Sequence, residues 1–65
     1  MPVITIEAGR MDKEKKAKLV ETFTKSASEI LGIPEQAFVT LIRENDADNV
    51  GNGGKLLSDI MAERK

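Results

Sequence analysis

A chain of 65 residues without a single cysteine or histidine has few ways to hold a fold together by itself. Chains this short bury a smaller share of their surface than larger domains do, and they commonly depend on disulfides, a bound metal or partner subunits. Without cysteine and histidine the first two routes are closed or nearly so. With Phe23 and Phe38 as its only aromatic residues, a monomeric core would depend on aliphatic side chains. We therefore expect one domain, residues 1–65, stabilised by self-association.

The charge balance disfavours several classes of partner. Ten basic and eleven acidic residues give a net charge of -1 at pH 7, so the sequence predicts no nucleic-acid or anionic-membrane partner. No apolar run approaches the roughly 20 residues that a membrane span needs. The opening residues also lack the basic start and apolar core of a signal peptide. We expect a cytoplasmic protein, for which small charged substrates remain open.

Three segments predict a βαβ unit. Residues 2–8 alternate like a strand, and residues 38–43 form a second β-rich run that is apolar on both faces, which indicates coverage on both sides. Between them, residues 13–31 carry apolar side chains at spacings of three and four, which is typical of a helix. Asp12 is a suitable N-cap and Gly32 a suitable C-cap. Such a crossover predicts parallel strands. The apolar stripe of the helix consists of Leu19, Val20, Phe23, Ala27, Ile30 and Leu31.

The last third of the chain has weaker signals. Residues 45–49 are polar and predict a loop, and residues 50–54 contain three glycines, so the backbone there must turn sharply or approach something closely. Apolar residues then recur with helical spacing up to a charged tail at residues 63–65, which predicts a short closing helix.

Few side chains of this sequence are suited to acid–base chemistry. Histidine, cysteine, tyrosine and tryptophan are all absent, so most familiar nucleophiles and general bases are missing. The aspartates lack metal-ligand spacing, and we interpret them, like the lysines of the helix, as ordinary surface charge. No metal site is predicted. The four aspartates are Asp12, Asp46, Asp48 and Asp59.

Pro2 differs from these residues because of its position. A small second residue favours removal of the initiator Met1, which would leave Pro2 as a free secondary amine. An α-amino group titrates near pH ~8, and burial among apolar neighbours lowers its pKa because desolvation disfavours the charged form. Such an amine is a suitable general base. The alternative is that Pro2 merely starts a strand, where its missing N–H costs nothing.

Six segments in this order carry a further signal: Pro2–Ile6, Gly9–Arg10, the lysine-rich helix, Gly32–Pro34, Ile42–Glu44 and Asn49–Lys55. Together they span the whole chain and resemble the 4-oxalocrotonate tautomerase family. Pro2 and Arg10 carry most of the specificity of this match. The resemblance implies an α+β fold, a βαβ subunit whose sheet is completed by neighbouring subunits, assembled as a homohexamer that is a trimer of dimers. It also implies a cofactor-free isomerase, in which the N-terminal proline moves a proton in a small enol or unsaturated 2-oxo carboxylate such as 2-hydroxymuconate. In that scheme Pro2 is the catalytic base and Arg10 binds the substrate carboxylate.

Arg10 cannot reach Pro2 of its own chain if the first strand stays extended. Eight residues at about 3.3 Å each place it roughly 26 Å away. Arg10 would then serve a neighbouring subunit, and antiparallel pairing of two first strands would bring one strand's end toward the other's start. An arginine suits the role because its planar, charged fork matches a carboxylate bidentately. The alternative is a polar residue that closes a strand.

Two positions depart from the best-known members of that family. Val39 stands where they have a second arginine, and Val50 stands where they have a phenylalanine. Arg43, on the same strand face as Val39 but about 13 Å along the strand, is the candidate replacement, with a structural ion pair as the alternative. Lys55 is a weaker candidate. Val50 would help keep Pro2 dry, with less apolar area than phenylalanine.

Other functions remain open. Relatives that hydrate or dehalogenate haloacrylates use a carboxylate to activate water, which Asn52 cannot replace. A weakly active or non-catalytic oligomeric scaffold would have the same sequence features. A ribbon-helix-helix DNA-binding dimer is disfavoured because the first strand carries no basic residue. The leading prediction is a tautomerase with Pro2 catalytic and with Arg10, Arg43 and Val50 binding the substrate.

Overall fold

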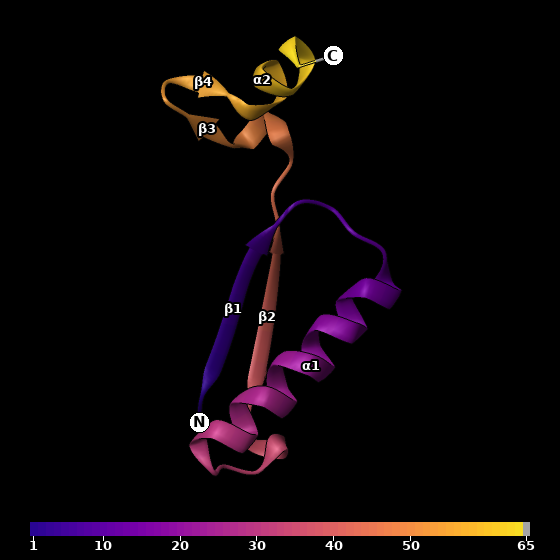
Figure 1. Cartoon of the computed structure of the whole chain (residues 1–65), viewed down its shortest axis with the longest axis vertical. Helices are drawn as coiled ribbons and strands as arrows, with labels where there is room; N and C mark the ends of the chain where they lie inside the picture. The colour runs from indigo at the N-terminus through magenta and orange to yellow at the C-terminus, as the bar shows by residue number, and fades with distance from the viewer. Residues whose placement is uncertain (65) are drawn as a thin grey trace.

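The structure is a computed structural model that describes residues 1–64, and its first two thirds form a βαβ unit (Figure 1). Strand β1 spans Val3–Ala8, helix α1 spans Lys13–Leu31 and strand β2 spans Val39–Glu44. The two strands are parallel, with Val3 opposite Val39 and Ala8 opposite Glu44. The predicted βαβ unit with parallel strands is confirmed. Lys65 of the predicted charged tail lies outside the described residues.

Both predicted caps bound α1. The Asp12 side chain accepts a hydrogen bond from the backbone N–H of Lys15 at 2.8 Å, and Gly32 adopts a left-handed conformation with φ 68°. The N–H of Gly32 donates to the carbonyl of Ser28 at 2.9 Å, which closes the last turn. A helix of 19 residues is about 28 Å long. A six-residue strand is only about 20 Å long, so α1 extends beyond the sheet that it covers.

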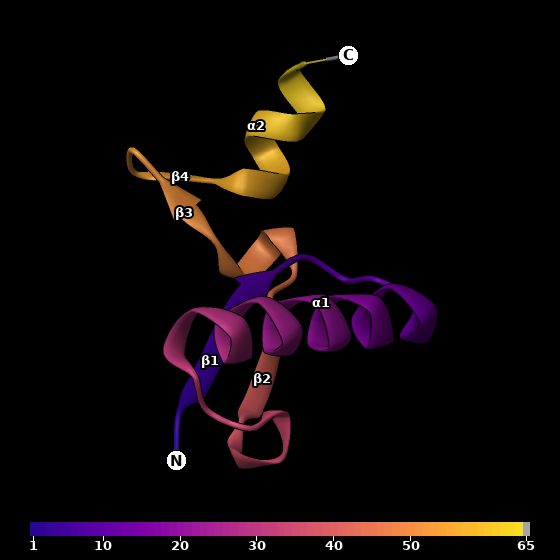
Figure 2. The ribbon, with the colours of Figure 1, turned by 60° about the horizontal axis from the view of Figure 1, so that its bottom comes forward.

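Only part of the apolar stripe of α1 is packed. Leu19, Phe23 and Ala27 are half-buried against the sheet, whereas Ile30 is 83% exposed and Leu31 is 56% exposed. The two exposed residues are at the C-terminal end of α1, whereas the first turns of the helix are the ones that extend past the sheet (Figure 2).

Only one face of the sheet is covered within the chain. The even-numbered residues of β1 are half-buried under α1, and Val3, Thr5 and Glu7 are exposed on the other face. On β2 the same exposed face carries Val39, which is 38% exposed, and Leu41, which is 45% exposed. The coverage on both sides predicted for the second strand is therefore not present in a single chain, because α1 supplies only one layer.

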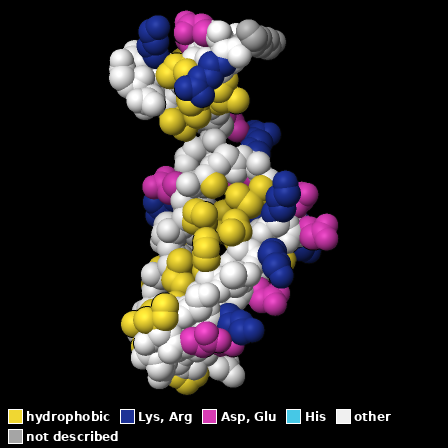
Figure 3. Space-filling model, in the orientation of Figure 1, with side chains coloured by type: hydrophobic (Ala, Val, Ile, Leu, Met, Phe, Trp, Pro, Cys, Tyr) yellow, Lys and Arg dark blue, Asp and Glu magenta, His cyan; other side chains and the backbone are white. Residues whose placement is uncertain are grey.

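The chain taken alone is elongated. Its radius of gyration is 15.5 Å, whereas a compact domain of this length has one of roughly 11 Å. It exposes 5271 Å², compared with about 4,100 Å² for a folded monomer of this mass. No side chain among residues 1–64 is fully buried, and hydrophobic side chains lie open on the surface (Figure 3). A single chain therefore leaves exposed the apolar surface that a protein of this size normally buries.

The remaining elements lie beyond the ends of the strands (Figure 1). Gly53 and Gly54 have φ of 62° and 84°, which is the positive-φ backbone of a tight hairpin turn. The sharp turn expected there is confirmed, as is the short closing helix, and no helix among residues 1–64 is long and apolar enough to cross a membrane. These elements are the short helices η1 (Glu35–Ala37) and η2 (Ala47–Asn49), the antiparallel strands β3 (Gly51–Asn52) and β4 (Lys55–Leu56), and helix α2 (Leu57–Glu63).

Candidate active site

Pro2 and Arg10 lie at opposite ends of β1. The carbonyl of Pro2 accepts a hydrogen bond from the N–H of Val39 at 3.0 Å, which fixes Pro2 beside the start of β2. At the other end, the carbonyl of Ala8 accepts from the N–H of Asn45 at 2.7 Å. Because β1 is continuous between these two bonds, Pro2 and Ala8 lie about 20 Å apart within one chain, and Arg10 follows two residues after the strand. Pro2 and Arg10 do not share a site in a single chain.

Arg10 is held by a carboxylate of its own chain. Its Nε donates to Oδ1 of Asp46 at 2.6 Å and its Nη2 donates to Oδ2 at 3.1 Å, a two-point contact. The Arg10 side chain is 77% exposed and that of Asp46 is 47% exposed. The hydrogen bond and charge of Asp46, with a smaller contribution from Glu44, raise the pKa of the Arg10 guanidinium above its ordinary value. Arg10 therefore stays charged, with its side edge occupied.

Asp46 is an exposed charge, as expected, but it is also the partner of Arg10. Its partner lies 36 residues earlier in the chain, and the contact forms because the segment after β2 passes the segment after β1. No local pattern in the sequence could have indicated this pairing, since it depends on two adjacent parallel strands ending together.

A second carboxylate fixes the backbone next to Arg10. Glu44 accepts hydrogen bonds from the N–H of Met11 at 3.0 Å and from Nζ of Lys16 at 2.8 Å. These two bonds, that of Lys16 first, hold the pKa of the Glu44 carboxyl below its ordinary value. Lys16 is thus engaged in the fold, contrary to its interpretation as a surface lysine. With Ala8 bound to Asn45, the backbone is anchored on both sides of Arg10.

Arg10 lies at the edge of an open groove of about 590 Å³. Val50 lines the same groove, so the structure brings together two of the four predicted site residues. Leu57 and Met61 of α2 add apolar surface, and Glu7 adds a second carboxylate. The groove combines one cation with apolar walls, which suits a small organic anion.

Arg43 lies apart from Pro2. It pairs in register with Glu7 and lies on the exposed face of the sheet, near the end of β2. Glu7 accepts a hydrogen bond from Nδ2 of Asn45 at 3.3 Å, and within residues 1–64 no ion pair joins Glu7 to Arg43. Lys55 lies 3.9 Å from Glu63, at the hairpin. The roles of Arg43 and Lys55 in substrate binding stay predictions.

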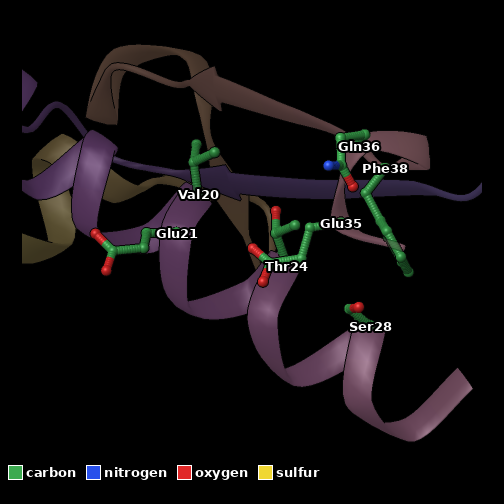
Figure 4. Close-up of a pocket in the computed structure, with 7 residues that line it drawn as sticks. All are labelled: Val20, Glu21, Thr24, Ser28, Glu35, Gln36 and Phe38. Atoms are coloured by element: carbon green, nitrogen blue, oxygen red, sulfur yellow. The ribbon is translucent and has the colours of Figure 1, made fainter. Parts of the chain in front are cut away.

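A larger groove of about 700 Å³ lies between α1 and η1 (Figure 4). Its lining includes Glu21, Glu35 and Phe38, and no basic residue among those described contributes to it. Two carboxylates without a cation disfavour an anionic substrate, so this groove is a poorer candidate than the one at Arg10 despite its size. Within residues 1–64, no cluster of three or more acidic side chains could hold a metal ion.

The fold and the proline before its first strand define a small βαβ subunit of the tautomerase type, and comparisons with known proteins agree. The family model described as tautomerase enzyme matches residues 2–60, and this chain belongs to that family. The resemblance to 4-oxalocrotonate tautomerases is confirmed, and the chain has a tautomerase-superfamily function of the isomerase type.

Solved structures of family members resemble this chain over most of its length. DmpI from Archaeoglobus fulgidus is 43% identical over 89% of this chain and 100% of its own, with a TM-score of 0.82. YwhB, a homologue of 4-oxalocrotonate tautomerase, is 34% identical over 89% of this chain and 97% of its own, with a TM-score of 0.84.

Two further structures mark the breadth of the family. TomN, a 4-oxalocrotonate tautomerase homologue in the tomaymycin biosynthetic pathway, is 25% identical over 98% of this chain and 100% of its own, with a TM-score of 0.92. A structure from work on trans-3-chloroacrylic acid dehalogenase activity, 24% identical over 85% of this chain and 93% of its own with a TM-score of 0.66, shares the fold. A search of curated proteins found no match.

Proposed function

We propose that this chain is a cofactor-independent tautomerase that uses the Pro2 amine, freed by removal of Met1, as its general base. The substrate is a small enol or unsaturated 2-oxo carboxylate. The observation that carries the proposal is the anchoring of Pro2, which is half-buried and bound through its carbonyl to Val39, while Met1 is 90% exposed. Removal of Met1 therefore removes little packing and leaves the amine fixed at the start of β1.

The chemistry needs no other reactant. The amine takes a proton from one position of the conjugated substrate, the electron pair shifts along the conjugated system, and the amine returns the proton at a carbon. An amine kept among apolar side chains has a pKa lowered toward neutrality, which suits both steps. Arg10 binds the carboxylate and draws electron density toward it as negative charge develops.

A second copy of the chain unites the two ends of the site. Because Pro2 and Ala8 direct their carbonyls to β2, strand alternation directs the backbone groups of Val3, Thr5 and Glu7 to the free edge of β1. Antiparallel pairing of two such edges joins odd-numbered residues with odd-numbered ones and keeps the even-numbered residues on one face. When the two-fold axis passes through Thr5 or Ile6, Pro2 lies opposite Ala8 or Arg10 of the other copy.

The exposed face of the sheet supports further association. Val3 is 58% exposed on that face, next to Val39 and Leu41, and no element among residues 1–64 covers it. Aliphatic residues on an open sheet face favour burial by another copy. We propose a homohexamer built as a trimer of dimers, with the base and the cation of each site supplied by different chains.

The test compares the wild type with Pro2→Ala. Mass spectrometry first establishes that Met1 is absent, and absorbance then follows ketonisation of 2-hydroxymuconate and phenylenolpyruvate. We expect kcat to fall by about 100-fold or more, the usual contribution of a general base. Pro34→Ala, the matched control at the chain's other proline, retains the wild-type rate. Equal rates in the wild type and Pro2→Ala would overturn the proposal.

One observation favours a weakly active oligomeric scaffold as the second candidate. The residue beside Pro2 on β2 is Val39, so the chain places no cation of its own at the base. A scaffold would give rates that are low with both substrates and insensitive to Pro2→Ala.

A further inference from the structure

The groove at Arg10 carries more negative than positive charge. Arg10 is the one basic residue that lines it among those described, whereas Glu7 and Asp46 contribute two carboxylates. At the other end of β1, the residue whose N–H binds Pro2 is the uncharged Val39. A bound substrate therefore meets one cation from this chain, and that cation is already paired.

The geometry of the pair leaves room for one more carboxylate. A guanidinium has five N–H groups, and Asp46 occupies the Nε donor and one Nη2 donor along the side edge. The outer edge, formed by the second N–H of Nη2 and one N–H of Nη1, is the pair of donors that takes a carboxylate end-on. Asp46 thus positions Arg10 for a single substrate carboxylate and balances its charge before the substrate arrives.

We propose that this site selects a monoanion with an apolar body over a dianion, and that Asp46 sets the preference. The inference rests on the proposed function and names its substrate class. The first carboxylate binds the outer edge of Arg10. A second carboxylate in the groove meets Glu7 and Asp46, whereas an alkyl or aryl group meets Val50, Leu57 and Met61.

The size of the preference follows from the distance between charges. A second carboxylate several ångströms beyond the first lies about 10 Å from Asp46, where partly screened repulsion changes an equilibrium by roughly three- to tenfold. The Debye length at 0.1 M salt is also about 10 Å, so added salt weakens this contribution. A loss of Arg10 positioning, in contrast, affects monoanions and dianions alike.

The experiment measures kcat/KM for phenylenolpyruvate, a monoanion, and for 2-hydroxymuconate, a dianion. In Asp46→Asn, we expect the ratio of the two values to shift toward the dianion by roughly three- to tenfold at low salt, and by less at high salt. Asp46→Glu, which restores the charge, keeps the wild-type ratio. Asp48→Asn removes a nearby charge outside the groove and keeps the ratio as well.

Two outcomes overturn the inference. One is an unchanged ratio in Asp46→Asn, and the other is an equal shift in Asp48→Asn, which would reflect net charge alone. Calorimetric binding of phenylpyruvate and adipate makes the same monoanion-to-dianion comparison without turnover, so the inference is tested even if Pro2→Ala shows that the proposed function fails.

Discussion

Mixing two inactive variants tests whether each site is shared between chains. Pro2→Ala removes the base and Arg10→Ala removes the cation, and the roughly 26 Å between these residues in one chain is far beyond an arginine side chain. Backbone hydrogen bonds tie β1 to β2 at both ends, so no bending of one chain brings the residues together. A functional pair must then come from two chains.

The expected recovery follows from symmetry. Each shared site takes its base from one chain and its cation from another. In a random equal mixture, about half of the chains that supply the base keep Pro2 and about half of those that supply the cation keep Arg10, so about a quarter of the sites are intact. If both residues served the same chain, no site would be intact. We expect the mixed sample to recover about a quarter of the wild-type rate with phenylenolpyruvate, after joint unfolding and refolding, with native mass spectrometry to count mixed assemblies.

A second mixture also distinguishes sites that are shared between chains from sites that lie within one chain. When the wild type is mixed equally with the double variant Pro2→Ala/Arg10→Ala, shared sites predict about a quarter of the wild-type rate and unshared sites predict about half. The reasoning would be refuted if mixed assemblies of Pro2→Ala and Arg10→Ala had a rate equal to the average of the rates of these two variants measured separately. The site would then have to form without Arg10.

Two further predictions concern assembly and pH. Leu41→Asp places a carboxylate on the exposed sheet face. In the assembly this costs about 1 kcal/mol of lost apolar burial plus several kcal/mol for an unpaired buried charge. Sedimentation should therefore show a dissociation constant raised about 1,000-fold, whereas Leu41→Met should assemble normally. The lowered pKa of Glu44 means that its bonds to Lys16 and Met11 stabilise the fold above the ordinary glutamate pKa of about 4.3, and this contribution is lost as pH falls through the lower folded-state pKa. Thermal unfolding of Glu44→Gln should therefore depend less on pH in that acidic window than the wild type or Glu29→Gln does; parallel curves for all three would contradict the assignment.

Local signals in the sequence predicted the elements well where they were long. Helix α1 has the predicted bounds because both of its ends carry residues that bind orphan backbone groups, Asp12 at the start and Gly32 at the end. Strand β1 begins one residue later than predicted, and β2 both begins and ends one residue later than predicted. The two-residue strands β3 and β4 were missed because two residues are too few to show alternation, although the glycine turn between them was predicted.

The site could be predicted only as far as chain geometry reaches. The rise of an extended strand is enough to separate Pro2 from Arg10, and the structure has a continuous strand, Val3–Ala8, between them. The pairing of Arg10 with Asp46 could not be derived, because it joins loops 36 residues apart whose approach depends on how two strands end. The meeting of Arg10 and Val50 in one groove depends on the same loops.

The proposed arrangement links catalysis to assembly more tightly than a site within one chain would. One end of β1 holds the proposed base beside Val39, and the other end holds the cation, its balancing carboxylate and the groove. Since neither end contains both groups, the proposal implies that the chain supplying Arg10 sets the substrate charge preference and that the chain supplying Pro2 carries out proton transfer. Substitutions at Asp46 should therefore change the substrate selectivity of a site whose base belongs to the neighbouring chain. In mixed assemblies, the selectivity of each site should follow the chain that carries Asp46 and not the chain that carries Pro2.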